Sequence, residues 1–183
     1  MFGIALAGGT CVALSTFAKS SELEYQLRVG DVSLLIFERS MLDRDFAAEL
    51  IALCPELANA VNASGEVQST RLPFLRRAVC IDEAAPAGAF EAWPDFLHGE
   101  PKAPAPLIEA IAAEVAPTAR GLVFFSSGST AKPKAIVHAH RAAAIQALLA
   151  GLAALVGLRL GGALLAFAVA NPIIAGIAAV SVA

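Results

Sequence analysis

The chain has 183 residues, of which 57% are hydrophobic and 16% are charged, and its formal net charge is -3 at pH 7. So large an apolar fraction excludes an intrinsically disordered chain, and the slight acidity disfavours a nucleic-acid partner, which needs a basic surface. The three widely spaced cysteines, Cys11, Cys54 and Cys80, exclude a disulfide scaffold, and we expect them to be buried free thiols.

The first segment, residues 2–14, is apolar enough to suggest the hydrophobic region of a signal peptide. No basic residue precedes it, however, and Gly8, Gly9 and Thr10 interrupt it, so we expect core structure rather than a cleaved leader. The chain is thus expected to start inside hydrophobic structure, as a piece of something longer would.

The next segment has the pattern of a capping box over Ser21 to Glu24, in which the Ser21 hydroxyl accepts an N–H and Glu24 reaches back. It predicts a helix whose Leu23 and Leu27 share one face and which ends at Gly30.

Apolar runs and helical patterns alternate along the middle of the chain. The expected strands are Val32–Phe37, Ala78–Ile81 and Gly121–Phe125; the expected helices are Asp45–Leu53, stopped by Pro55, and a segment marked by Leu107, Ile108, Ile111 and Val115. Residues Ala84–Pro106 are rich in Pro and Ala and are expected to form a surface linker pinned by Trp93 and Phe96. This alternation predicts fold class α/β, with helices layered on a mainly parallel sheet.

The last segment, Leu160 to Ala183, contains no charged residue and is long enough to span a membrane. Glycine, asparagine and proline interrupt it, and no basic residue follows it. We favour a buried strand over Ala163–Val169 followed by a buried helix that begins at Pro172. A membrane span is the alternative.

The most informative stretch follows the strand that ends at Phe125. It reads Ser126-Ser127-Gly128-Ser129-Thr130-Ala131-Lys132-Pro133-Lys134. Small residues let backbone N–H groups approach phosphate oxygens, while hydroxyls add donors and lysines add charge. Ligands of open α/β sheets bind beyond the carboxyl ends of strands, where this stretch falls. Composition therefore suggests a phosphate-binding loop that is not of the Walker type, and a Ser-rich surface turn is the alternative.

The whole of residues 124–141, which continue through Ala135-Ile136-Val137-His138-Ala139-His140-Arg141, resembles the signature loop of the AMP-forming acyl-CoA synthetases. These enzymes belong to the adenylate-forming superfamily. Residues 13–17 and 22–28 resemble the family segment that precedes its first phosphate loop, and the likeness extends over roughly residues 1 to 170. Within the superfamily the chain looks most like the fatty- and aryl-acyl-CoA branch.

The resemblance implies a cytoplasmic ligase that uses ATP with Mg²⁺ to activate a carboxylic acid and passes the acyl group to CoA. It implies that the loop holds the β- and γ-phosphates. The residues it assigns to ATP binding are Ser126, Ser127, Gly128, Ser129, Thr130, Lys132 and Lys134. Lys134 is the lysine expected to contact phosphate more directly, because Pro133 fixes the turn around it.

Two features depart from the family pattern. Alanine stands at Ala131 and Ala135, where the family usually has glycine, which is expected to lower nucleotide affinity. The family motifs for adenine, ribose and catalysis lie further along than Ala183. We therefore expect residues 1–183 to be a partial large N-terminal domain without the small C-terminal domain, and to be inactive alone. The alternatives are a non-catalytic nucleotide-binding remnant or partner subunit and a small membrane protein.

His138 and His140 are spaced so that both rings share one face of a strand, which could suit a metal ion. No third ligand presents itself, because His98 falls in the expected linker and the cysteines are scattered. We expect the pair to pack the strand and to border the acyl pocket, as the resemblance implies.

Overall fold

A computed structural model of the chain describes residues 2–59, 66–99, 103–126, 132–160 and 177–181. The helices are α1 (Phe2–Leu6), α2 (Ser20–Val29), α3 (Phe46–Leu53), the 3-10 helix η1 (Pro55–Ala58), α4 (Trp93–His98), α5 (Ala105–Glu114) and α6 (His140–Leu160). The strands are β1 (Thr10–Leu14), β2 (Val32–Phe37), β3 (Ser40–Met41), β4 (Arg44–Asp45), β5 (Arg77–Cys80), β6 (Glu91–Ala92), β7 (Arg120–Ser126), β8 (Lys134–Ala139) and β9 (Ile177–Ser181).

The main sheet has the strand order β6-β5-β2-β9-β1-β7-β8. β1 pairs in parallel with β7, β2 pairs in parallel with β5, and β5 pairs in parallel with β6, while β9 runs antiparallel between β1 and β2. β1, β2, β5, β6 and β7 therefore share one direction, and β8 returns antiparallel beside β7. The predicted α/β class with a mainly parallel sheet is confirmed.

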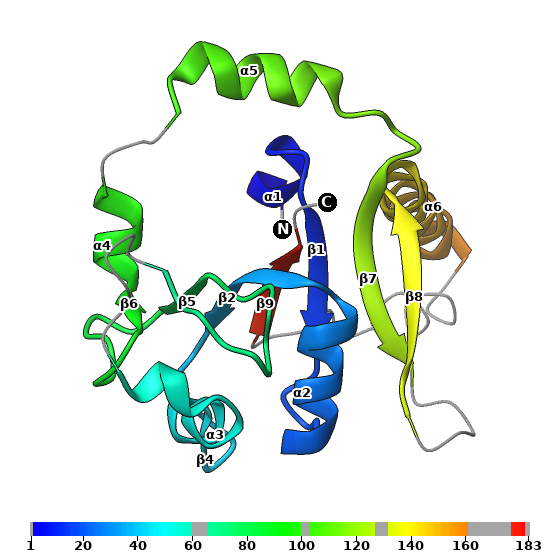
Figure 1. Ribbon diagram of the computed structural model, residues 1–183. Helices are drawn as coiled ribbons and strands as arrows, with labels where there is room; N and C mark the ends of the chain where they lie inside the picture. The colour runs from blue at the N-terminus through cyan, green and yellow to red at the C-terminus, as the bar shows by residue number, and fades with distance from the viewer. Residues whose placement is uncertain (1, 60–65, 100–102, 127–131, 161–176, 182–183) are drawn as a thin grey trace.

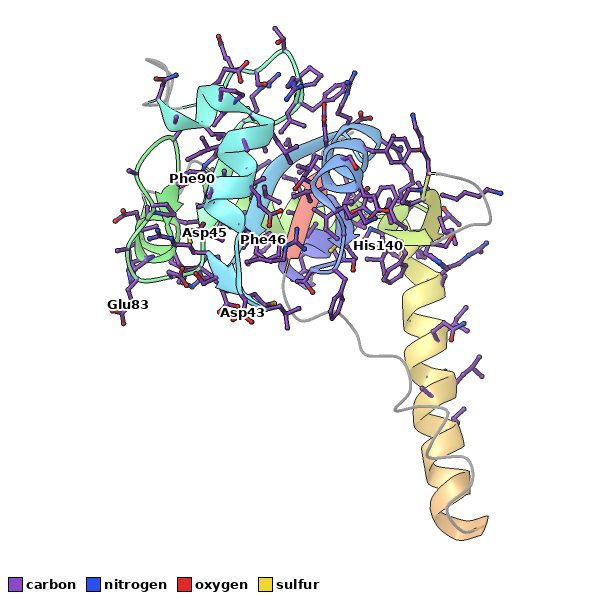
Figure 2. The ribbon with its side chains drawn as sticks, turned by 90° about the horizontal axis from the view of Figure 1, so that it is seen from below. Asp43, Asp45, Phe46, Glu83, Phe90 and His140 are labelled. Carbon is purple, nitrogen blue, oxygen red and sulfur yellow. The ribbon has the colours of Figure 1, made fainter. Side chains whose placement is uncertain are left out.

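The parallel strands define two edges of the sheet. Their amino ends lie towards α1 and α5, at the top of Figure 1, and β1 and β7 end at the bottom of that view. Figure 2 looks onto this carboxyl edge and shows α6 extending away from the rest of the molecule.

The core lies on one face of the sheet, where α2 and α3 cover it. Val12 and Leu14 of β1 are fully buried and belong to the same cluster as Leu23 and Leu27 of α2, as the helical spacing predicted. Helix α3 adds Phe46, Ala47, Leu50 and Leu53 to this cluster. These contacts fix the position of both helices, because well-packed interiors leave little room for movement.

The start of α2 differs from the prediction. Lys19, not Ser21, is the N-cap residue, and its backbone N–H donates to Glu22 Oε2 at 3.0 Å. Only a carboxylate three residues into the helix can reach back to this N–H, so Glu22 takes the role expected of Glu24. The predicted end of the helix at Gly30 is confirmed.

The segment predicted as a surface linker contains two regular elements. β6 extends the sheet beside β5, and α4 follows it directly. Trp93 and Phe96 stack with ring centroids 5.5 Å apart, three positions apart on α4, so the two aromatic residues expected to pin a linker instead define a helix face. The prediction of a surface linker over Ala84–Pro106 was therefore wrong where β6 and α4 form.

The C-terminal expectation is only partly covered by the described residues. Ala163–Val169 and Pro172 lie outside them. Residues Ile177–Ser181 form β9, so the helix expected after Pro172 does not extend through them. Ile177 and Val180 suit a strand with neighbours on both sides. Within the described ranges, no helix combines the length and apolarity that crossing a bilayer requires.

The three cysteines are buried free thiols, as predicted. Burial raises the pKa of Cys11, Cys54 and Cys80 above the ordinary value of a thiol. A raised pKa leaves little thiolate near neutral pH, so none of the three has the character of a nucleophile.

Candidate functional site

The predicted phosphate loop connects two neighbouring strands at the carboxyl edge. Ser126 is the last residue of β7, Lys134 is the first of β8, and the two are directly paired across the hairpin. Strand alternation places both on the same face, with the exposed Lys134 side chain at the base of the loop. Ser127, Gly128, Ser129, Thr130 and Ala131 lie outside the described residues.

The other predicted lysine contacts helix α2. Lys132 Nζ lies 5.5 Å from the centroid of the Tyr25 ring, within the range of a cation–π interaction. Lys132 therefore lies close to α2, which follows the neighbouring strand β1. Nothing in the local sequence around either residue predicts this contact, because it depends on how β1 and β7 pair.

An arginine joins the loop after β1 to the start of α3. Arg44 donates to Glu49 through Nε at 2.8 Å and Nη2 at 2.6 Å, and its Nη1 donates to the carbonyl of Thr16. Its guanidinium also lies 4.6 Å from the centroid of the Phe46 ring. Ser20 at the start of α2 donates to Glu49 at 3.2 Å. One ion pair thus fixes the exits of β1 and β2 relative to each other.

The paired carboxylate is held ionised by these bonds. The Arg44 guanidinium lowers the pKa of Glu49, and the carboxylate of Glu49 raises the pKa of Arg44 in turn. Both side chains are about three-quarters covered, with 24% and 23% of their surface exposed. The pair is therefore less screened by water than an ordinary surface ion pair.

A second ion pair lies nearby but is more open. Asp45 is the N-cap of α3, where its side chain accepts from the Ala48 N–H at 3.0 Å. The same carboxylate lies 3.4 Å from Arg39 Nε, and this pair is 51% and 40% exposed. The Ala48 N–H is the main cause of a lowered pKa for Asp45, and Arg39 adds to it. Figure 2 shows Asp45 beside Phe46 and Asp43 on this side of the molecule.

The two candidate histidines do not share one strand. His138 is in β8, where its ring meets Phe124 edge-on with centroids 5.6 Å apart. His140 begins α6 and donates its backbone N–H to the Ala119 carbonyl at 3.0 Å. Across the described ranges, no three His, Cys, Asp or Glu side chains gather in a way that could hold a metal ion. The expectation of a strand-packing role is confirmed for His138, whereas the placement of His140 on the strand was wrong.

At this edge the structure thus brings together Ser126, Lys134 and Lys132, three of the seven predicted binding residues. It also adds Tyr25, Arg44 and Glu49, which the sequence reasoning missed. Arg44 and Glu49 are five apart with a strand end between them, so no helical spacing signalled their pairing.

Comparison with known proteins gives one match. The profile of a family described as AMP-binding enzyme matches residues 1–168. No curated protein and no solved structure matches the chain.

Proposed function

The chain belongs to the AMP-binding enzyme family, and from this premise we propose that it takes part in the ATP-dependent activation of a carboxylic acid, fatty or aryl. Its partners are small molecules: ATP with Mg²⁺, the acid, and CoA as the acyl acceptor. The proposed setting is the cytoplasm. We also propose that residues 1–183 form part of the large domain of such an enzyme.

The proposed reaction has two steps. An oxygen of the substrate carboxylate attacks the α-phosphorus of ATP. The bond between the α-phosphorus and the oxygen that bridges to the β-phosphate breaks, and pyrophosphate leaves with the electron pair. The CoA thiolate then attacks the acyl carbon, and AMP leaves with the electron pair of the cleaved bond. The role proposed for this chain's loop is to bind the β- and γ-phosphates, where fixed donors and cations stabilise the charge that builds up on departing pyrophosphate.

The observation that carries this proposal is the pairing of Ser126 with Lys134 at the carboxyl end of a parallel strand. That edge is where open α/β sheets bind ligands, and an exposed lysine beside a hydroxyl suits phosphate oxygens. The proposed binding loop also contains Ser127, Gly128, Ser129, Thr130 and Lys132. The ordered start of β8 fixes the backbone of Lys134, so its ammonium needs less ordering on binding.

Calorimetric titration of the whole chain with ATP and Mg²⁺ tests the binding role. We expect saturable binding that Lys134→Ala weakens. Lys19→Ala is a matched control, because Lys19 is also an exposed lysine and caps α2 through its backbone alone. Absence of ATP binding by the wild-type chain would refute the proposed function.

Acid-dependent exchange of pyrophosphate into ATP tests for catalysis. Exchange with a fatty or aryl acid would show that the chain activates acids and would contradict the expectation that residues 1–183 are inactive alone. Binding of ATP without exchange in any acid of the panel agrees with that expectation and with the second candidate, a nucleotide-binding protein without catalysis. The departure at Ala135, an alanine that stands in β8 where the family usually has glycine, favours keeping this second candidate.

A further inference from the structure

The contact between Tyr25 and Lys132 links the segment before β8 to helix α2. Lys132 Nζ lies 5.5 Å from the Tyr25 ring centroid. In Figure 1, α2 lies below β1, at the same end of the sheet as the end of β7. The contact therefore spans the carboxyl edge between two parallel neighbours, β1 and β7.

Helix α2 is a firm support for this contact. Leu23, Gln26 and Leu27 are buried, and they flank Tyr25 on both sides along the helix. The end of α2 packs closely on β1 at Gly30. A Cβ atom built on Gly30 would lie only 3.0 Å from Val12 Cγ1, so there is little room between the two elements. The half-buried Tyr25 ring is thus carried by a helix that the core holds in place.

The two lysines of the loop occupy different environments. Lys132 has its ammonium over an aromatic ring, whereas Lys134 stands exposed at the start of β8, opposite Ser126. Pro133 lies between them and restricts the backbone, so a fixed Lys132 also constrains the approach to Lys134.

We propose that Tyr25 is a positioning residue for ATP binding: its ring holds Lys132 and so fixes the described segment 132–134 against α2, leaving Lys134 to meet the phosphate. This inference rests on the proposed function for the nature of the ligand. The contact itself can be tested without nucleotide.

The experiment compares Tyr25→Leu, which removes the ring, with Tyr25→Phe, which retains it. Phe17→Leu is the matched control, because Phe17 is an aromatic residue at the same edge that is 80% exposed. Amide hydrogen exchange of residues 132–139 is measured in the free chain, and binding of ATP and of inorganic tripolyphosphate is measured by calorimetry.

We expect faster exchange in residues 132–139 for Tyr25→Leu, with Tyr25→Phe and Phe17→Leu close to wild type. We also expect Tyr25→Leu to weaken ATP and tripolyphosphate binding by about twofold to fivefold, the range of an exposed cation–π contact. Equal loss for both ligands would place the effect on the phosphates rather than on the adenosine.

Unchanged exchange in Tyr25→Leu would overturn the inference, and so would equal exchange increases in Tyr25→Leu and Tyr25→Phe. Faster exchange throughout the sheet and α3 would also overturn it, because Tyr25 would then be a general structural residue. A wild-type chain that binds neither ligand would refute the proposed function, while the exchange comparison would still decide whether Tyr25 holds the loop.

Discussion

Because Gly121 has no side chain, the imidazole of His140 can occupy the space beside its Cα atom. A Cβ atom built on Gly121 would lie 2.6 Å from His140 Nδ1 and 2.9 Å from Cγ, closer than real Cβ contacts come. His140 is itself held by its backbone bond to Ala119. The missing side chain in β7 therefore allows α6 to begin beside the strand, directly after the β7–β8 hairpin ends.

We therefore expect Gly121→Ala to lower the free energy of unfolding by about 1–3 kcal/mol, the usual cost of forcing extra atoms into a packed position. In a His140→Ala background the same substitution should cost much less, because the ring that it meets is gone. Urea unfolding of the two single variants and the double variant measures this coupling. Equal costs of Gly121→Ala in both backgrounds would contradict the proposed clash.

The Arg44–Glu49 pair is expected to stabilise the fold more than the neighbouring Arg39–Asp45 pair. Arg44→Met loses two short charge-assisted bonds and the bond to Thr16, and should cost about 1–2 kcal/mol. Arg39→Met is the matched control, and its exposed, longer pair should contribute less than about 1 kcal/mol. Urea unfolding gives both values, and a larger loss in Arg39→Met would reverse this ranking.

The N-cap of α3 should make stability depend on pH. Asp45→Ala removes the acceptor for the Ala48 N–H and should cost about 1 kcal/mol at neutral pH. Because the pKa of Asp45 is lowered on folding, its contribution is present above the ordinary value of about 4 and is lost as the pH falls through the folded value. The difference between wild type and Asp45→Ala should therefore shrink between about pH 6 and about pH 3.

Unfolding titrations of both proteins across that range provide the measurement. Asp45→Asn is the control, because asparagine keeps the cap without the charge. It should lose less stability than Asp45→Ala at neutral pH. A difference that grows as the pH falls would contradict the assigned direction of the pKa shift.

The elements that the sequence predicted well are those with local causes. Val32–Phe37 is a strand with the predicted bounds, since charged residues flank a continuous apolar run. Helix α3 covers all of the predicted range Asp45–Leu53 except its first residue, and Asp45 is its N-cap. The position of β9 could not be predicted, because its place between β1 and β2 depends on pairing with strands at the far end of the chain.

The candidate site likewise contains residues that local sequence predicts and residues that only the tertiary structure reveals. The loop was recognised from residue types in order along the chain, and Ser126 and Lys134 lie where a strand followed by a loop predicts. Tyr25 and Arg44 were missed, because each acts across elements that only the folded sheet brings together. Residue order reveals a phosphate-binding composition, whereas the contacts that hold such a loop in place come from tertiary structure.

Lys132 and Lys134 are expected to have different roles in ATP binding. Lys134→Ala should weaken binding about tenfold or more, because an exposed ammonium opposite Ser126 is free to form charge-assisted bonds to phosphate. Lys132→Ala should weaken ATP binding only about twofold to fivefold, because this substitution removes the contact with Tyr25 and not a direct bond to phosphate. Adding Tyr25→Leu to Lys132→Ala should then cost little more, since both changes remove the same contact, whereas Tyr25→Leu and Lys134→Ala should combine additively. Calorimetric titration with ATP and Mg²⁺ gives each affinity, and thermal unfolding of each variant verifies that it is folded.

Two outcomes would contradict these roles. If Lys132→Ala lost as much affinity as Lys134→Ala, Lys132 would itself be a phosphate ligand. If neither substitution changed the affinity, the loop would be a surface turn.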